Sequence, residues 1–168
     1  MLMTDQVKEM RVTKALEAGQ AGAVVDGKLE FGELTLEVDA ARIAAVCDFL
    51  KNKDRFIRLS AITCVDRYPM EPRFEVIYHL HSMKRPGVTE DERVRLKCRL
   101  GGEKPEIDSV YPVWRAADWY EREVFDLFGV GFRNHPNLKR ILMPNDWEGH
   151  PLRKDYPIHG HKYSYQNE

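Results

Sequence analysis

The sequence predicts an α+β fold, a two-layer sandwich of helices on a mixed β-sheet followed by an extended C-terminal segment. Segments whose apolar residues recur at helical spacing are interleaved with segments in which apolar and polar residues alternate. After Gly101, prolines and aromatic residues become frequent and the regular alternation stops. We therefore expect an α+β core domain over residues 1–130 and an extended segment over residues 131–168.

Two helices are expected in the first third of the chain. Residues 5–18 have helical spacing, and Gly19 is a stop signal. Asp39 can cap a second helix that runs to Asn52. The apolar residues that recur at helical spacing in this second helix are Ile43, Val46, Cys47 and Leu50.

The first strands are expected between these two helices. The dipeptide Asp26-Gly27 suits the positive φ of a tight turn, so we expect a hairpin of residues 21–25 and 28–31. Residues 33–38 alternate cleanly and predict a further strand.

Three strands follow. Residues 56–65 are almost continuously apolar, which is typical of a central strand buried on both faces. Residues 73–82 and 93–100 alternate, and residues 84–91 connect them. The outward row of the last strand is basic and has no interleaved aromatic residue for base stacking. We therefore expect a charged face that pairs with Glu75 and acidic residues of neighbouring strands. The basic residues are Arg93, Arg95, Lys97 and Arg99.

One helix is expected after Gly101. Asp118 precedes Glu121 by three residues, as in an Asp variant of the capping box, and Gly129 ends the helix. Residues 132–157 show no periodicity and cannot build a core of their own. We expect them to lie across another surface. The alternative is that they pack back on their own sheet and complete the core.

The composition and net charge of the chain argue against several classes of function. A net charge of -1 gives no field that would attract nucleic acid or an anionic membrane. No apolar run reaches the roughly 20 residues of a spanning helix, so we expect membrane contact only through partners. The cysteines are far apart and lack a C-x-x-C pair, which argues against a disulfide framework, a zinc site or an iron–sulfur cluster. They are Cys47, Cys64 and Cys98.

Reactive side chains are densest between residues 121 and 155. In an enzyme, Glu123 and Asp126 could form an acid/base pair with His135 or His150 as proton carrier. In a structural site, the same residues are ion pairs and helix ends, with Arg122 and Asp126 one helical turn apart. We favour the structural interpretation, because the spacing matches no nucleophile elbow and no phosphate loop.

Residues 119–130, 135–142 and 146–157 together resemble the signature of the thirty-kilodalton subunit family of respiratory complex I, known as the C type in bacteria. The Glu-Arg-Glu core, the His-Pro pair and the ending Gly-His-Pro-Leu-Arg-Lys-Asp-Tyr-Pro carry the resemblance. Residues 59–66 and 73–80 are also similar to strands of this family.

The resemblance implies a structural subunit, without an active site of its own, of the proton-translocating NADH:quinone oxidoreductase. That complex passes electrons from NADH through FMN and iron–sulfur clusters to a quinone. The cofactors would be held by partner subunits, with none in this chain. The expected partners are the large quinone-site subunit of the D type and the cluster-bearing subunits of the B and I types. The expected location is the peripheral arm, on the cytoplasmic side of the cell inner membrane.

The resemblance also implies that the signature residues bind partners. An alternative within the family is the equivalent subunit of a membrane-bound hydrogenase or of another quinone- or ferredoxin-linked dehydrogenase. An alternative outside it is a free-standing metal hydrolase that uses His135, His150 and Glu123. The signature residues are Glu121, Arg122, Glu123, Asp126, His135, Pro136, Arg140, Trp147, His150, Arg153, Lys154 and Asp155.

Overall fold

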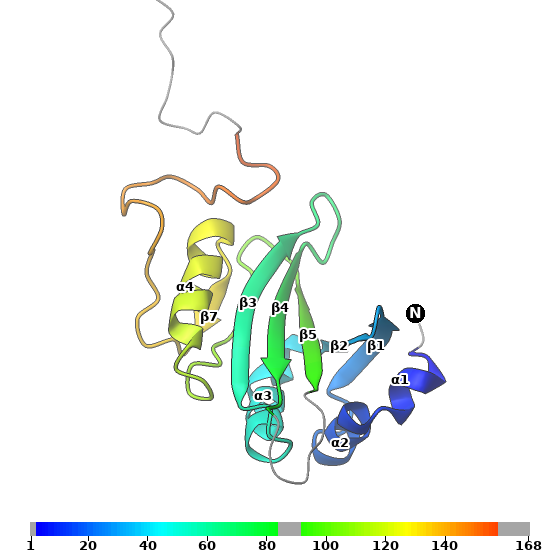
Figure 1. Cartoon of the computed structure of the whole chain (residues 1–168). Helices are drawn as coiled ribbons and strands as arrows, with labels where there is room; N and C mark the ends of the chain where they lie inside the picture. The colour runs from blue at the N-terminus through cyan, green and yellow to red at the C-terminus, as the bar shows by residue number, and fades with distance from the viewer. Residues whose placement is uncertain (1–2, 84–91, 158–168) are drawn as a thin grey trace, which may run out of the picture.

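A five-stranded mixed sheet with helices on one side forms the body of the molecule (Figure 1). The computed structural model describes residues 3–83 and 92–157. The strand order is β1-β2-β5-β4-β3, in which β2 and β5 are parallel and the other pairs antiparallel. The large-sheet strands are β1 (Val24–Glu30), β2 (Glu33–Val38), β3 (Arg58–Asp66), β4 (Phe74–His81) and β5 (Arg93–Leu100).

The helices bury their apolar sides against this sheet in a single hydrophobic core. They are α1 (Asp5–Glu9), α2 (Arg11–Gly19), the 3-10 turn η1 (Ala40–Arg42), α3 (Ile43–Asn52) and α4 (Ala117–Phe128). Helix α4 packs beside β3, and the chain after α4 runs back along this helix (Figure 1). The predicted α+β sandwich is confirmed.

Several elements lie where the sequence places them. Strands β2, β4 and β5 direct alternate apolar side chains inward, as expected. The Asp39 carboxylate accepts a hydrogen bond from the Ala41 N–H, so it caps the helical segment that continues into α3. The four apolar residues expected on one side of α3 are all buried. The expected connection over residues 84–91 lies outside the described residues.

The expected first helix is interrupted at Met10, where the backbone is extended with φ -64° and ψ 139°. The reason is geometric. At 3.6 residues per turn, Val7 and Leu16 would lie on opposite sides of one continuous helix. Both side chains are fully buried in the same core, and the break at Met10 makes this possible.

The expected turn at Asp26-Gly27 is wrong. This dipeptide lies inside β1, and the chain reverses at Phe31 and Gly32, whose φ angles are 52° and 77°. Glycine is needed at position 27 because the side chains of Leu36 and Val7 approach the backbone closely there. A Cβ at Gly27 would lie 2.9 Å from side-chain atoms of both residues.

Strand β3 is an edge strand of the sheet and not the expected central one. Its inward side chains Leu59, Ile62 and Cys64 are buried, whereas Thr63 is exposed. The run is apolar because α4 covers its inner side, where the Tyr120 hydroxyl donates to the Ser60 carbonyl. The short parallel pair β6 (Glu106–Asp108) and β7 (Gly131–Arg133) was not expected, because neither segment is long enough to show alternation.

The β1–β2 turn yields a stability prediction. Phe31 is fully exposed and has a positive φ, which costs a bulky L-residue about 1 kcal/mol. Because Asn-Gly is the preferred pair for such a turn, Phe31→Asn should raise the free energy of unfolding by about 0.5–1 kcal/mol in urea titrations. Gly32→Ala replaces the flexible glycine of this turn and should lower the free energy of unfolding. A lower urea midpoint for Phe31→Asn would show that the Phe31 side chain stabilises the fold.

Candidate interaction site around helix α4

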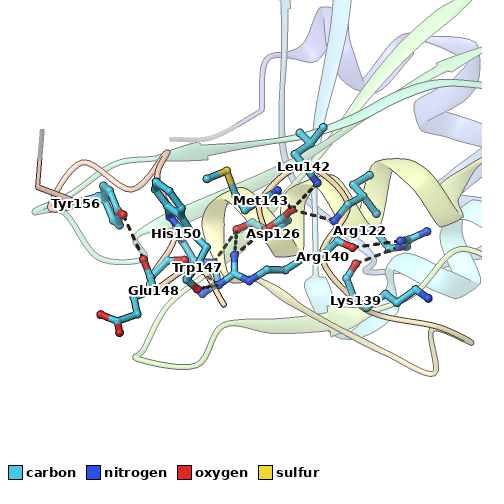
Figure 2. Close-up of polar contacts among 12 residues, drawn as sticks. Arg122, Asp126, Lys139, Arg140, Leu142, Met143, Trp147, Glu148, His150 and Tyr156 are labelled. Carbon is cyan, nitrogen blue, oxygen red and sulfur yellow. Dashed lines mark hydrogen bonds and ion pairs between the residues drawn. The ribbon is translucent and has the colours of Figure 1, made fainter. Parts of the chain in front are cut away.

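The Asp126 carboxylate on α4 is the centre of the site (Figure 2). It is fully buried. Its Oδ1 accepts a hydrogen bond of 2.6 Å from Arg140, and its Oδ2 accepts the backbone N–H groups of Ile141, Leu142 and Met143 over 3.0, 2.8 and 2.9 Å. Burial would raise the pKa of Asp126, but these hydrogen bonds outweigh it and hold the pKa below its usual range. We call these five residues the Asp126 hub.

We call residues 134–157, which follow β7, the tail. Arg140 extends the hub to the next part of this tail. Its guanidinium also donates to the carbonyl oxygens of Trp147 and Gly149, over 3.1 and 2.9 Å. The His150 ring donates from Nδ1 to the Asp126 carbonyl over 2.9 Å. A guanidinium has five N–H donors in a rigid fork, so one side chain can join several backbone carbonyls. The irregular chain after α4 is thereby fixed to the helix.

The end of α4 is closed by the tail. The backbone of Gly129 has the left-handed conformation, with φ 73°, as expected of a residue that ends a helix. Arg153 donates from Nε to the Phe128 carbonyl over 2.6 Å, and the Leu152 N–H donates to the Leu127 carbonyl over 3.0 Å. Helix-end carbonyls carry partial negative charge, which favours a cation such as Arg153.

A second ion-pair node joins the tail to the sheet. Arg73 at the start of β4 donates to both oxygens of Asp66 at the end of β3, over 2.8 and 2.7 Å. The same guanidinium donates to Asp155 over 3.0 and 2.6 Å, and the Lys154 N–H donates to Asp66 over 2.8 Å. Burial opposes ionisation of Asp66, yet its bonds to Arg73 and to backbone N–H groups hold its pKa well below the usual range.

The expected pair of Arg122 with Asp126 is wrong. Arg122 donates to the carbonyl oxygens of Lys139 and Arg140, and its guanidinium lies 5.3 Å from the centre of the Trp119 ring. Asp126 instead pairs with Arg140, which lies in the tail. Arg122 and Asp126 therefore both bind the segment that crosses this helix.

The expected capping box is also wrong. The helix begins at Ala117, so Asp118 lies inside the first turn and its side chain makes no cap. The buried Glu121 carboxylate accepts hydrogen bonds from the Ser109 hydroxyl and the Val110 N–H, over 2.5 and 2.7 Å. It thus fixes the loop between β6 and α4.

The residues of the enzyme alternative do not converge. His135 lies against Asp118 and Glu121 near the start of α4, whereas His150 lies against Asp126 near its end. Glu123 is exposed on the helix and makes no hydrogen bond or ion pair with the part of the chain that is described. A cavity of about 280 Å³ is lined by residues of the uncovered sheet face, among them His79, His81 and Arg95. The signature residues do not line it.

The uncovered sheet face carries the expected charge pairs. Arg95 pairs with Glu33, Lys97 lies 3.4 Å from Glu75, and Arg99 lies 3.0 Å from Glu37. Arg95, Lys97 and Arg99 of the outward basic row are therefore balanced by acidic residues of neighbouring strands.

Most signature residues serve the chain's own structure, and the exposed ones are Glu123, Pro136, Lys154 and Asp155. Partner contact by the signature stays a prediction. The domain boundary at residue 130 also stays a prediction. The contacts of residues 139–155 favour the alternative in which the tail completes the fold. Sequence reasoning missed Asp66, Arg73 and Ser109 as site residues, because their partners lie far away along the chain.

The comparisons with known proteins cover this part of the chain. The family model described as "Respiratory-chain NADH dehydrogenase, 30 Kd subunit" matches residues 36–162. The chain belongs to this family. The C-type subunit of the NADH-quinone oxidoreductase of Citrifermentans bemidjiense is 43% identical over 150 residues, which cover 89% of this chain and 90% of the relative. The matched residues contain the Asp126 hub and the Asp66 node, whereas α1, α2 and β1 lie outside them.

Two solved structures share the fold. A trypsin-resistant fragment (1–134) of Nqo5 superposes with a TM-score of 0.62 at 29% identity, covering 77% of this chain and 100% of the fragment. A chain from the membrane-bound sulfane sulfur reductase, an archaeal respiratory membrane complex, superposes with a TM-score of 0.68 at 27% identity. This second match covers 88% of this chain and 84% of the reductase chain. The family fold therefore occurs in more than one kind of respiratory complex.

The Asp126 hub yields the second prediction. Asp126→Ala leaves Arg140 and three backbone N–H groups without their acceptor, which should lower the free energy of unfolding by about 3–5 kcal/mol. Glu123→Ala, on the exposed side of the same helix, should change it by less than about 0.5 kcal/mol. Urea unfolding of the full chain measures both. Equal losses for the two variants would contradict the central role of the hub.

Proposed function

We propose that this chain is a structural subunit, without an active site of its own, of the peripheral arm of a proton-translocating NADH:quinone oxidoreductase. The observation that carries the proposal is how the signature charges are used. Asp126, Arg140 and Arg153 direct their hydrogen bonds to backbone groups of the same chain, apart from the bond between Asp126 and Arg140 themselves. A catalytic set would instead direct such groups toward a substrate cavity. Family membership supports the same conclusion, as do the relatives, which are C-type subunits of NADH-quinone oxidoreductases.

The proposal assigns the redox chemistry to partner subunits. NADH oxidation would use FMN, and iron–sulfur clusters would carry the electrons to the quinone. This chain would hold none of these groups. Its cysteines, Cys47, Cys64 and Cys98, are all free thiols buried in the core. Burial raises the pKa of the Cys64 thiol to about 12, which disfavours the thiolate that a metal cluster requires.

The proposed partners are the large quinone-site subunit of the D type and the cluster-bearing subunits of the B and I types. The proposed location is the cytoplasmic side of the cell inner membrane, where the chain would be held by these partners. Among the described residues, no helix combines the length and apolarity needed to cross a bilayer.

A docking surface is proposed on α4 and the tail that crosses it. Three large apolar side chains are more than half exposed there: Trp119 at 63%, Leu142 at 60% and Leu152 at 51%. Trp119 is stacked against Arg122, and tryptophan and arginine dominate the energetics of protein interfaces. The Asp126 hub holds Leu142 in place, because Asp126 binds the Leu142 N–H. We propose that this surface is covered by the D-type subunit.

A second candidate is the equivalent subunit of a complex with another electron donor. The resemblance to the sulfane sulfur reductase chain supports it, since the fold match covers 88% of this chain. The higher identity to NADH-quinone oxidoreductase subunits favours the first candidate. The two candidate functions are distinguished by testing which electron donor reduces the purified complex.

The docking surface yields the third prediction. In co-expression with the D-, B- and I-type subunits, Trp119→Ala combined with Leu142→Ala should reduce incorporation of the chain by more than about tenfold. The complexes that do form should keep full NADH:quinone activity per assembled complex. The measurement is quantitative native electrophoresis together with an activity assay.

The matched control is Phe31→Ala, an exposed aromatic residue outside the family match, which should leave incorporation unchanged. Unfolding in urea should show that the double variant remains folded. A complex that assembles fully but has lost activity would contradict the structural role. A flavin band or stoichiometric iron in the chain purified alone would contradict the assignment of cofactors to partners.

A further inference from the structure

Three titratable side chains meet beneath the first half of α4, two of them fully buried and the third, Asp118, 29% exposed. Glu121 is fully buried, and its Oε2 lies 3.8 Å from Nε2 of His135, whose side chain is also fully buried. The same nitrogen lies 3.4 Å from Oδ1 of Asp118. Both Nε2 of His135 and Oδ1 of Asp118 are shielded from solvent and lack a well-formed hydrogen bond within the described ranges. Such a cluster requires a proton to balance its charge.

The backbone decides which nitrogen of His135 carries hydrogen. The Asn137 N–H donates to Nδ1 over 3.1 Å, so Nδ1 is the acceptor and Nε2 carries the hydrogen. This Nε2–H faces the carboxyl groups of Asp118 and Glu121. Protonation of Nδ1 would remove the hydrogen bond that holds the turn at residues 135–137. An additional proton is therefore better placed on a carboxyl group.

Glu121 can hold that proton without moving. Its Oε1 accepts the Val110 N–H, and its Oε2 lies 2.5 Å from the Ser109 hydroxyl, which can donate to it or accept from it. The pKa of Glu121 is raised to about 7, because burial and, to a smaller extent, the neighbouring Asp118 outweigh the opposing effect of these two hydrogen bonds.

The groups that face the cluster supply little compensating charge. Arg122 on α4 faces it but donates its hydrogen bonds to the carbonyls of the tail. Cys47 on α3 and Tyr78 on β4 face Glu121, and burial raises the pKa of both, so they are neutral. From the loop after β6, the Tyr111 ring lies 6.0 Å from the His135 ring and is covered by Arg115.

We propose that Asp118, Glu121 and His135 form an internal proton-binding site that ties release of its proton to movement of the turn at residues 135–137. When the proton leaves Glu121, the buried Glu121 carboxylate and the 29% exposed Asp118 carboxylate lie next to one neutral, buried imidazole. The repulsion is relieved if the His135 turn shifts, and this turn begins the segment that crosses α4. The inference goes beyond the structural role and does not depend on it.

Nuclear magnetic resonance titration of the full chain tests the proposal directly. The Glu121 carboxyl carbon should titrate with a midpoint near 7, far above the 4.3 or so of a free glutamate. The Asn137 amide should shift with the same midpoint, while the His135 ring keeps its hydrogen on Nε2. A Glu121 midpoint near that of free glutamate would overturn the proposal. An Asn137 amide that does not follow Glu121 would also overturn it.

The pH dependence of stability gives an independent test. Between about pH 4.3 and 7 the folded chain holds the Glu121 proton and the unfolded chain does not. The contribution of Glu121 to stability is thus full below this window and is lost as pH rises through it. Relative to the natural chain, Glu121→Gln should flatten this fall, whereas Glu123→Gln on the exposed side of α4 should leave it unchanged. Equal slopes for the natural chain and Glu121→Gln would overturn the proposal. If Glu121→Gln does not fold, the nuclear magnetic resonance titration of the natural chain decides the question.

Discussion

The chain after α4 depends on one buried carboxylate. Residues 134–157 contain no helix or strand, so their backbone groups need other partners. Asp126 supplies them by accepting three consecutive N–H groups and the Arg140 guanidinium, which in turn binds two further carbonyls. A buried charge is tolerated only when it is fully hydrogen-bonded, and Asp126 meets this condition through the tail. The helix and the tail therefore require each other.

The same logic explains why a signature rich in charge is compatible with the structural role that we propose. The buried charged groups Asp66 and Asp126 are paired with backbone groups and opposite charges, some from distant parts of the chain, as in the Asp66–Arg73–Asp155 node. These pairs fix an irregular segment to the helix and the sheet. The apolar side chains of Trp119, Leu142 and Leu152 remain exposed on that fixed framework. A rigid surface loses little conformational entropy when a partner covers it.

Local patterns predicted much of the fold. The alternation in β2, β4 and β5 and the spacing in α3 are properties of neighbouring residues, so they can be read directly. The sequence could not show the break at Met10, which arises because Val7 and Leu16 must enter the same core. It also could not show that Asp126 pairs with Arg140, fourteen residues away, and not with Arg122 one turn away. The motif located the site, whereas only the folded chain shows which partner each charge takes.

Amide hydrogen exchange at Ile141, Leu142 and Met143 in the isolated full chain tests the account most directly. These amides lie outside any helix or strand, and their acceptor is the Asp126 carboxylate. If the Asp126 hub forms within the chain itself, all three should exchange far more slowly than in an unfolded peptide, and Asp126→Asn should remove most of the protection. Exchange at the unfolded rate in the natural chain would show that the tail is ordered only by its partners, and would contradict the account.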